Sequence, residues 1–259
     1  MNQDGTNTGN NPAEAATRIG ADQEKLGDRV RPNQKKLASE LKSHYDFIVC
    51  GSGCSGSVVA RRMAENPDVS VLLLEAGGTD EVPNVGEAIQ WSTNLGTERD
   101  WGFVAQPNPH LNGRAIPLNM GKVLGGGSSI NVMAWSREHK NHWEFFSAEA
   151  GDPAWNYESV LNIYRRIEDW HGAPDPKYRG VGGPVFVQPA PHRNPIFPAR
   201  LEGARESGIP TFENPNGRMQ EGEGGSSIED IRALAGKRQS IFSLLYLSHH
   251  GPPESHRTY

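Results

Sequence analysis

The chain has 259 residues, a formal net charge of −5 at neutral pH and 22% charged residues. This length suffices for one large domain or two modest ones. An acidic chain without a basic stripe is not expected to bind nucleic acid, and no run of about 18 apolar residues predicts a membrane span. The polar N-terminus lacks the apolar core of a secretory signal, and two cysteines cannot build a disulfide framework. We therefore expect a soluble, cytoplasmic protein.

Residues 1–43 are rich in Asn, Gln, Gly, Asp and Lys and poor in large apolar side chains. Such a segment cannot bury enough apolar surface to offset the entropy lost on ordering, which predicts a disordered polar leader. At its end, "ASELKSH" (residues 38–44) favours a short helix that leads into the ordered part.

The ordered part opens with the pattern strand, glycine turn, helix, strand. The consecutive apolar residues Phe47–Cys50 are typical of a strand covered on both faces. "SGSVVARRMAE" then has helical spacing that stops at "NPD", and residues 69–74, "VSVLLL", predict a second buried strand. Together they predict one parallel, right-handed βαβ unit.

Farther along, residues 77–117 are predicted to be irregular because Gly, Pro, Asn and Trp are frequent there. Helices are predicted at 143–150, 157–170 and 195–208, a strand at 182–191 and a turn region at 230–240. In the second helix, Val160, Leu161, Tyr164 and Ile167 share one apolar face.

The turn "GSGCSG" places Gly51, Gly53 and Gly56 in the spacing G-x-G-x-x-G. The first glycine permits a tight turn, the second lets the backbone approach a pyrophosphate, and the third lets helix and strand pack closely. The phosphates would lie at the helix N-terminus. Glu75, at the end of the second strand, is spaced to bond a ribose hydroxyl, which favours FAD or NAD over NADP. The spacing leaves FAD and NAD open, and a glycine turn with an unrelated surface glutamate is the alternative.

A second glycine cluster, "GKVLGGGSSINVMAWSR", spans residues 121–137. Its glycines and hydroxyls can form a backbone cradle for a diphosphate or a flat ring, which a plain NAD dehydrogenase does not need. The ordered series "GSGCSG", "LLLEAGG" and "GKVLGGGSSIN" resembles the glucose–methanol–choline (GMC) family of flavoprotein oxidoreductases. "DPAWNYESVLNIYRRIEDW" and "GGPVFVQP" are also similar to that family, and the resemblance runs from about residue 45 to 240.

The resemblance implies a truncated α/β fold. Residues 44–185 would form an incomplete Rossmann-like FAD-binding domain, 186–240 the start of an α+β substrate domain, and 241–259 an aberrant tail. Two positions depart from the family pattern: Met120 before Gly121, and Glu138 after Arg137.

The same resemblance implies a FAD site along both glycine segments, with one tryptophan between them. Its expected residues are Gly51, Ser52, Gly53, Gly56, Glu75, Ala76, Trp101, Val123, Gly126, Ser128, Asn131, Val132, Met133 and Ala134. Some members bond the flavin covalently to a histidine, and Ile130 stands at the matching position. We therefore expect non-covalent FAD.

The catalytic histidine of the family lies far beyond the length of this chain, so no catalytic residue is assigned. His249, His250 and His256 are not taken as substitutes, because they fall in a polar terminus with no orienting scaffold. The sequence predicts the N-terminal part of an FAD-dependent oxidoreductase that acts on the CH–OH group of a small alcohol. The alternatives are a catalytically inactive FAD-binding or apo remnant and an NAD-linked Rossmann dehydrogenase.

Several other residues are interpreted as structural. His139 and His142 are read as a polar helix start, and no metal site is predicted. Cys50 and Cys54 are expected to be small buried fillers. The Arg-Arg pairs at 61–62 and 165–166 are expected on solvated helix surfaces, and Trp135, Trp143, Trp155 and Trp170 are expected in the core.

Overall fold

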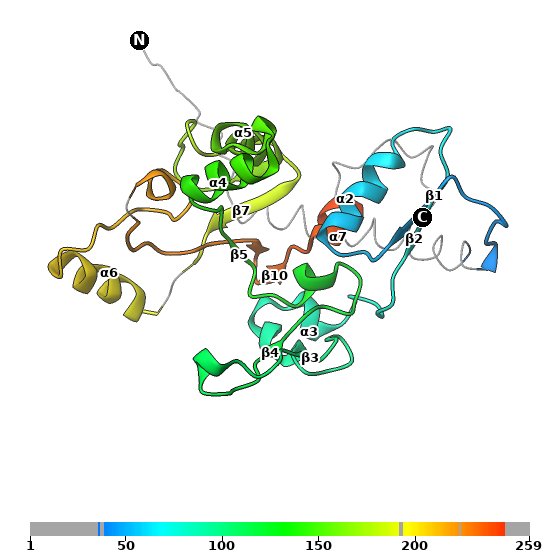
Figure 1. Cartoon of the computed structure of the whole chain (residues 1–259), viewed down its shortest axis with the longest axis horizontal. Helices are drawn as coiled ribbons and strands as arrows, with labels where there is room; N and C mark the ends of the chain where they lie inside the picture. Colours follow the sequence, from blue (N-terminus) through cyan, green and yellow to red (C-terminus); the bar gives the residue numbers. More distant parts are fainter. Residues whose placement is uncertain (1–35, 37–38, 192–193, 223, 247–259) are drawn as a thin grey trace, which may run out of the picture.

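The computed structural model describes residues 36, 39–191, 194–222 and 224–246 (Figure 1). The predicted leader therefore lies almost wholly outside the described residues, as do the three histidines of the predicted tail. Of the short helix predicted at 38–44, Ser39 is helical but residues 40–44 are not, so the helix ends before the ordered part begins. There the backbone N–H of Lys42 donates to the Tyr45 hydroxyl at 3.2 Å instead of continuing a helix.

The predicted βαβ unit is confirmed in its order and its parallel pairing. It consists of β1 (Phe47–Cys50), α2 (Cys54–Met63) and β2 (Val71–Leu74). The strands pair in parallel from Phe47 opposite Val71 to Cys50 opposite Leu74. This arrangement sets the glycine turn at the carboxyl end of β1, directly before α2.

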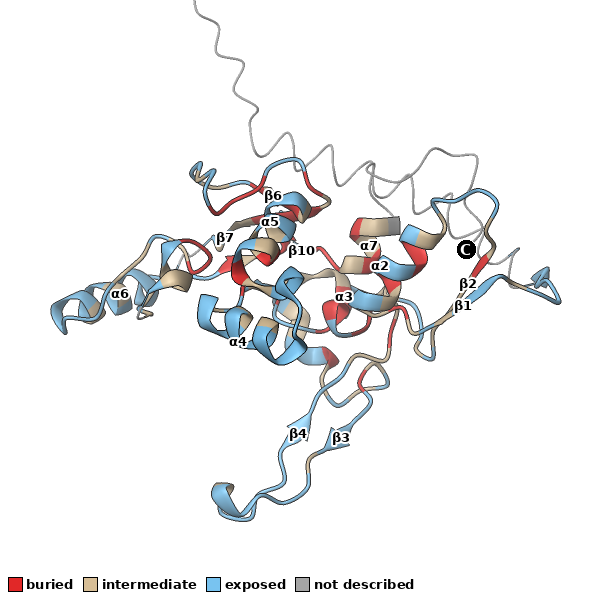
Figure 2. Cartoon of the chain, turned by 45° about the horizontal axis from the view of Figure 1, so that its top comes forward, coloured by how far each residue is buried: buried red, intermediate tan, exposed pale blue. Residues whose placement is uncertain are grey.

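The expectation that β1 is covered on both faces is wrong for this chain. Phe47 is 46% exposed, Ile48 59% and Leu74 46% (Figure 2). The β1–β2 sheet has two strands, and α2 packs against it. Among the described residues no third strand joins this sheet, so its other face stays open to solvent.

A second, four-stranded sheet has the order β5-β8-β7-β6. Its strands are β5 (Ala134–Trp135), β6 (Glu168–Trp170), β7 (Val185–Pro189) and β8 (Asp230–Ile231). Only the β6–β7 pair is parallel. Trp170, Val185, Val187 and Leu244 form the buried apolar cluster on this sheet.

Four of the helices in the described part of the chain come after the second glycine segment. They are α4 (Lys140–Ala150), α5 (Tyr157–Ile167), α6 (Ile196–Glu206) and α7 (Ile241–Tyr246), the last lying beside α2 (Figure 1). The predicted apolar face of α5 is confirmed, with Val160 only 6% exposed. The helix predicted to reach Trp170 ends at Ile167, because Glu168 enters strand β6 and a buried ion pair.

The expected core positions of the tryptophans hold for Trp170, which is 7% exposed. They fail for Trp155, which is 45% exposed and packs edge-on against Phe146 with ring centroids 5.2 Å apart. Trp155 ends the short helix η4 (Pro153–Trp155), at the start of which the Asp152 carboxylate accepts a bond from the Ala154 N–H.

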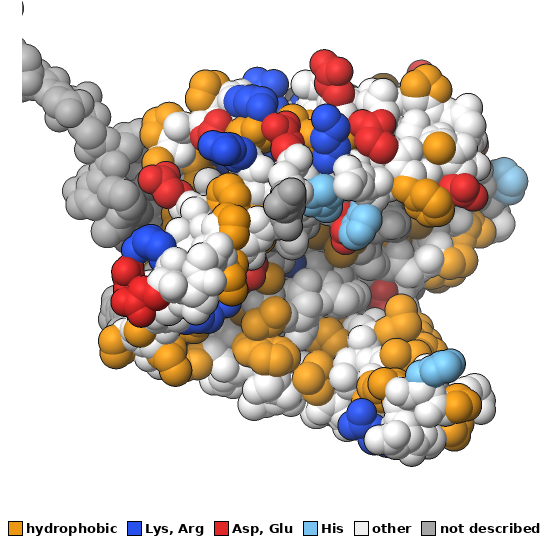
Figure 3. Space-filling model, turned by 60° about the vertical axis from the view of Figure 1, so that its left-hand side comes forward, with side chains coloured by type: hydrophobic (Ala, Val, Ile, Leu, Met, Phe, Trp, Pro, Cys, Tyr) orange, Lys and Arg blue, Asp and Glu red, His pale blue; other side chains and the backbone are white. Residues whose placement is uncertain are grey.

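The segment predicted to be irregular contains α3 (Pro83–Gly86), η1 (Ala88–Asn94) and a hairpin of β3 (Phe103–Val104) and β4 (Pro117–Leu118), whose loop holds η2 (Pro109–Leu111). The hairpin projects from the body of the molecule (Figure 2). In Figure 3 the hairpin is the arm at the lower right, and hydrophobic side chains lie on its surface, in agreement with the exposure of Phe103, Val104 and Leu118.

The last described part returns toward the glycine turn. It runs through η5 (Arg218–Glu221), then β8, and then the hairpin of β9 (Ala233–Leu234) and β10 (Lys237–Arg238). The predicted turn region at 230–240 thus contains a turn between short strands. Residues 241–246, predicted to begin an aberrant tail, form α7, where Phe242 and Leu244 are each 4% exposed.

The predicted boundary between residues 185 and 186 falls inside β7, whose sheet also takes strands from both sides of it. The division into two domains stays a prediction. No helix in the described part of the chain combines the length and the apolar character that a bilayer crossing needs.

Candidate functional site

The first glycine turn is held by close backbone packing. Gly51 has φ +93°, a left-handed conformation that favours glycine. A Cβ on Gly56 would lie 1.9 Å from the Gly51 carbonyl oxygen, so only glycine lets the first turn of α2 pack on the strand end. A Cβ on Gly53, by contrast, would have no atom within 4 Å, so the turn is open on that side.

Ser52 connects the turn to two other segments. Its backbone N–H and its hydroxyl both donate to the Glu75 carboxylate, at 2.8 and 2.6 Å. The Gly125 N–H in turn donates to the Ser52 hydroxyl at 3.1 Å. The side chain is fully buried, so it braces the site from inside and leaves only the backbone of the turn to face a ligand.

The second glycine segment packs directly on the first. Its short helix η3 (Gly126–Ser129) starts after Gly125, and Gly126 has φ +54°. A Cβ on Gly126 would lie 2.8 Å from the Gly53 Cα. Two glycine backbones thus meet where the sequence predicted a diphosphate cradle.

An open cavity of about 730 Å³ lies along this junction. Six predicted site residues line it: Gly51, Gly53, Glu75, Ala76, Trp101 and Gly126. Further walls come from Cys50, Leu74, Phe103, Asn119, Met120, Gly121 and Gly127. Its size is in the range of pockets that hold cofactors and small molecules.

The other predicted residues fall into two groups. Asn131, Val132 and Ala134 are exposed and continue from the cavity wall, since the Asn131 N–H donates to the Gly127 carbonyl at 2.9 Å. We call residues 131–134 the ledge. Within it, the Met133 side chain is 5% exposed and its φ is +63°, so the backbone there takes a left-handed kink.

The second group supports the site from within. Val123 and Ser128 are 0% and 1% exposed, and the Ser128 hydroxyl donates to the Gly125 carbonyl at 2.7 Å. The Gly51 carbonyl occupies the space in which a Cβ of Gly56 would lie. Ile130, which the resemblance matched to a flavin-bonded histidine, is 2% exposed. Side chains of this group do not line the cavity; they fix the backbone that does.

Sequence reasoning missed Asp100, next to Trp101. Its carboxylate accepts bonds from the N–H groups of Gly96, Gly102 and Met120 and from the Asn119 side chain, at 2.6 to 3.1 Å. These bonds lower the pKa of Asp100 to about 2. The carboxylate closes the base of the β3–β4 hairpin and so sets the cavity wall at Trp101 and Met120. The sequence signal was only a lone Asp before a tryptophan.

A second feature that sequence reasoning missed is a buried ion-pair network beneath β5. Glu168 pairs with Arg137 at 2.8 Å and Arg179 at 3.0 Å, and Arg179 also pairs with Asp230 at 2.8 Å. Burial lowers the pKa of Arg137 and raises that of Asp230. Two cations meet two carboxylates, so the network is neutral as a whole.

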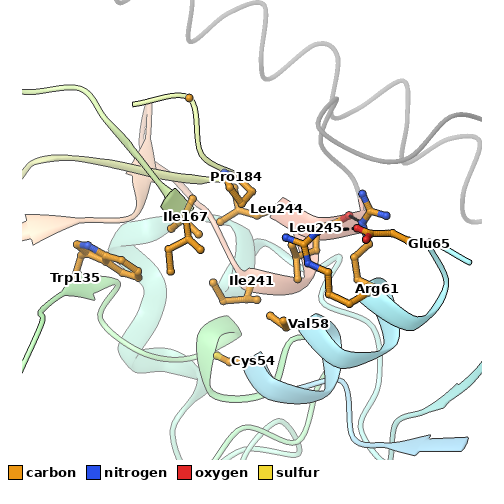
Figure 4. Close-up of a pocket in the computed structure, with 13 residues that line it drawn as sticks. Cys54, Val58, Arg61, Glu65, Trp135, Ile167, Pro184, Ile241, Leu244 and Leu245 are labelled. Carbon is orange, nitrogen blue, oxygen red and sulfur yellow. Dashed lines mark hydrogen bonds and ion pairs between the residues drawn. The ribbon is translucent and has the colours of Figure 1, made fainter. Parts of the chain in front are cut away.

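A smaller cavity of about 310 Å³ lies between α2, α7 and the start of β7. Figure 4 shows Trp135 at one end and Arg61 with Glu65 at the other. The residues around the two cavities correct two expectations from the sequence, one for Arg61 and one for the cysteines. Arg61 is 7% exposed, and its Nε donates to the Leu245 carbonyl at 3.2 Å, because α7 covers that side of α2. Cys54 lines this cavity and Cys50 the larger one, and both are exposed free thiols instead of buried fillers.

His139 and His142 have structural contacts. The His139 ring accepts a bond from the Asn141 N–H at the start of α4, and its other nitrogen lies 2.7 Å from the Gly222 carbonyl. His142 pairs with Glu138 at 2.6 Å on the surface. Within the described ranges, no group of three or more His, Cys, Asp or Glu residues is placed to hold a metal ion.

The residues present fit a dinucleotide. A cradle for phosphates is formed by three features: the left-handed Gly51, the N–H groups at the start of α2, and the backbone of Gly126, where a Cβ would clash with Gly53. The exposed ledge continues from its wall at Gly127. The class that fold and site define is an α/β dinucleotide-binding protein.

Comparison with known proteins narrows this class. The model of the GMC oxidoreductase family matches residues 45–244. The chain therefore belongs to the GMC oxidoreductase family, as the three glycine-containing motifs predicted.

Curated relatives include an "oxygen-dependent choline dehydrogenase" of Rhizobium meliloti (strain 1021), 41% identical over 184 residues, which are 69% of this chain and 32% of the relative. A protein of the same description from Rhizobium etli (strain CIAT 652) is 40% identical over 200 residues, 75% of this chain and 35% of the relative. The chain spans about a third of the length of the curated relatives it matches.

Solved structures agree. A pyridoxine 4-oxidase from Mesorbium loti superposes with a TM-score of 0.72 at 26% identity, covering 80% of this chain and 40% of that one. A formate oxidase gives a TM-score of 0.69 at 26% identity over 78% of this chain and 37% of that one. The predicted α/β flavoprotein fold and the expected cofactor of the family, FAD, are confirmed; its attachment without a covalent bond stays a prediction.

Proposed function

We propose that the chain binds FAD non-covalently and forms the cofactor-binding part of an oxidoreductase that acts on the CH–OH group of a small alcohol. The observation that carries this proposal is the contact of the two glycine segments at Gly53 and Gly126, on the wall of a cavity that also includes Glu75. A cytoplasmic location belongs to the same proposal.

Each part of the cavity has a role in this proposal. The backbone of Gly51, Gly53 and Gly126 holds the diphosphate at the start of α2. The Glu75 carboxylate accepts hydrogen bonds from Ser52 and Gly77. Its remaining acceptor capacity faces the ribose. Trp101 and Met120 limit the cavity on the hairpin side.

Bound FAD supplies the capacity to accept a hydride from an alcohol carbon, and the protein supplies position and electrostatics. No histidine among the described residues lines the cavity, so a base that takes the hydroxyl proton is not assigned within them. The relatives' description names choline, a primary alcohol, and we propose alcohols of that kind as substrates of the whole enzyme.

The test is a calorimetric titration of the 259-residue chain with FAD, ADP, FMN and NAD⁺. We expect FAD and ADP to bind, because both carry the diphosphate and the adenosine ribose. FMN lacks that half and should bind at least about tenfold more weakly, a difference of about 1.4 kcal/mol. Binding of NAD⁺ in preference to FAD would support the NAD-linked alternative, and binding of none of the four would refute the proposal.

A second candidate is a chain that binds FAD but catalyses nothing alone. It is favoured by the open face of β1–β2, where Phe47, Ile48 and Leu74 stay exposed. The two candidates separate by mixing FAD-loaded chain with choline without oxygen and following the loss of flavin absorbance. Bleaching means that the chain itself oxidises the alcohol; an unchanged spectrum favours the inactive form.

A further inference from the structure

Two buried arginines lie directly behind the ledge. Arg232 and Arg238, on the two sides of the β9–β10 hairpin, are 4% and 6% exposed. The Arg232 N–H donates to the Met133 carbonyl at 2.9 Å, and the Arg232 Nη1 donates to the Gln239 carbonyl at 2.7 Å. Arg238 donates to the carbonyls of Val85, Ser128 and Asn131 at 2.9, 3.2 and 2.6 Å.

Among the described residues, neither of these two charges has a carboxylate partner. In the part of the chain that the structure describes, neither Arg232 nor Arg238 makes an ion pair, and all their acceptors are neutral oxygens. The Arg238 Nη2 is buried without a hydrogen-bond partner. The network under β5 differs sharply, because there Glu168 and Asp230 neutralise two arginines. A buried cation without a partner is costly, so an uncompensated pair calls for a negative group nearby.

The pair also fixes the orientation of Asn131. The side-chain oxygen of Asn131 accepts from Arg238 Nη1 at 3.0 Å and from its neighbour Met133 N–H at 3.1 Å, and lies 3.4 Å from Arg232 Nη2. Three donors converge on one atom, which assigns it as the oxygen. The amide NH₂ group is therefore directed away from these three donors, and Asn131 as a whole is exposed.

We infer that Arg232 and Arg238 are positioning residues for the flavin ring: they aim the Asn131 NH₂ at it and place two uncompensated positive charges behind it. The inference rests on the proposed FAD site. Two-electron reduction with uptake of one proton leaves the ring with one negative charge, which buried cations favour because they are screened little by solvent. The pair thus favours binding of the ring and its reduction.

The test compares FAD with ADP, which lacks the flavin, on the full chain. Arg232→Gln is the main variant, because Arg232 makes fewer bonds than Arg238 and the fold should tolerate its loss. Arg232→Lys keeps the charge, Asn131→Ala removes the aimed donor, and Arg165→Gln makes the same chemical change on an exposed surface of α5. Affinities come from calorimetry, and the reduction potential of bound FAD from equilibration with a reference dye.

We expect Arg232→Gln and Asn131→Ala to weaken FAD about tenfold and leave ADP unchanged. Arg232→Gln should also shift the two-electron reduction equilibrium about tenfold toward oxidised flavin, which is about 30 mV. Arg232→Lys should restore most of both effects, and Arg165→Gln should change neither.

The inference is overturned, while the FAD site stands, if the native chain binds FAD no more tightly than it binds ADP. It is also overturned if the Arg232→Gln variant keeps the native affinity for FAD and the native reduction potential. Equal weakening of FAD and ADP would also overturn it, since that result indicates a general loss of structure. If neither ligand binds the native chain, the proposed function fails and the inference fails with it.

Discussion

The Ser52 hydroxyl donates a 2.6 Å hydrogen bond to the Glu75 carboxylate and thereby ties the glycine turn after β1 to the end of β2. Because the same hydroxyl accepts the Gly125 N–H, one buried side chain connects both glycine segments. Replacing Ser52 by alanine leaves the buried Gly125 N–H without its partner. We expect Ser52→Ala to lower the free energy of unfolding by about 1–3 kcal/mol.

Urea unfolding measures this loss, and FAD titration should show weaker binding in the same variant. The matched control is Ser55→Ala, which removes an exposed hydroxyl of α2. Equal stability of Ser52→Ala and Ser55→Ala would contradict the bracing role of Ser52.

Alanine substitutions at Gly53 and Gly56, three residues apart, should have opposite effects on stability and on FAD affinity. A Cβ at Gly56 would strike the Gly51 carbonyl, so Gly56→Ala should unfold the turn and reduce the amount of folded protein. A Cβ at Gly53 meets nothing, so Gly53→Ala should cost only the loss of a favourable N-cap residue, about 1 kcal/mol, yet it should weaken FAD strongly by filling the diphosphate position.

Thermal unfolding and FAD titration on both variants check this contrast. Gly203→Ala in α6, where a Cβ also meets nothing, serves as the control with intact FAD binding. Native FAD affinity in Gly53→Ala would remove Gly53 from the cofactor site.

The buried ion-pair network around Glu168 predicts a large loss of stability when its carboxylate is replaced by an amide. Glu168→Gln removes the charge that compensates Arg137 and Arg179, both buried. Because Asp230 still pairs with Arg179, the variant leaves buried Arg137 without a carboxylate partner, which should destabilise the fold by about 3–5 kcal/mol. Glu202→Gln removes an exposed partner of Arg205 and should change stability by less than about 1 kcal/mol. Similar values for the two variants in urea unfolding would show that the network is not a main support of the sheet.

Asp100 predicts a pH dependence. Its pKa is lowered from 3.8 to about 2, so its contribution to stability is present above pH 3.8 and is lost as the pH falls toward 2. Asp100→Asn lacks this contribution at every pH. The stability difference between native chain and variant should therefore be constant above about pH 5 and shrink between about pH 4 and 2.

Urea unfolding of both proteins across this range gives the difference directly. Asp68→Asn, which makes the same chemical change at an exposed carboxylate, is the matched control. A difference that grows as the pH falls would contradict the assignment to Asp100.

The parts of this fold that local pattern determines could be predicted from sequence. The β1–α2–β2 unit follows from two apolar runs around a glycine turn, and the apolar face of α5 follows from helical spacing. Gly51, Gly53 and Gly126 line one cavity; the left-handed backbone of Gly51 and Gly126 explains why glycine stands at those two positions, whereas their contact with FAD stays a prediction.

What depends on distant contacts could not be predicted. Arg61 was expected on the surface, but α7, which follows about 180 residues later, covers it. Helix α5 ends at Ile167 because Glu168 pairs with arginines from two other segments. Cys50 was expected to be buried because apolar runs usually imply a covered strand, whereas the β1–β2 sheet is open on one face.

The most direct test of the central claim is the visible absorbance spectrum of the 259-residue chain after free flavin has been removed. A FAD site built by the two glycine segments predicts a flavin spectrum that stays with the folded chain and passes into solution when the chain is denatured. A folded, colourless chain that added FAD does not colour would contradict the claim.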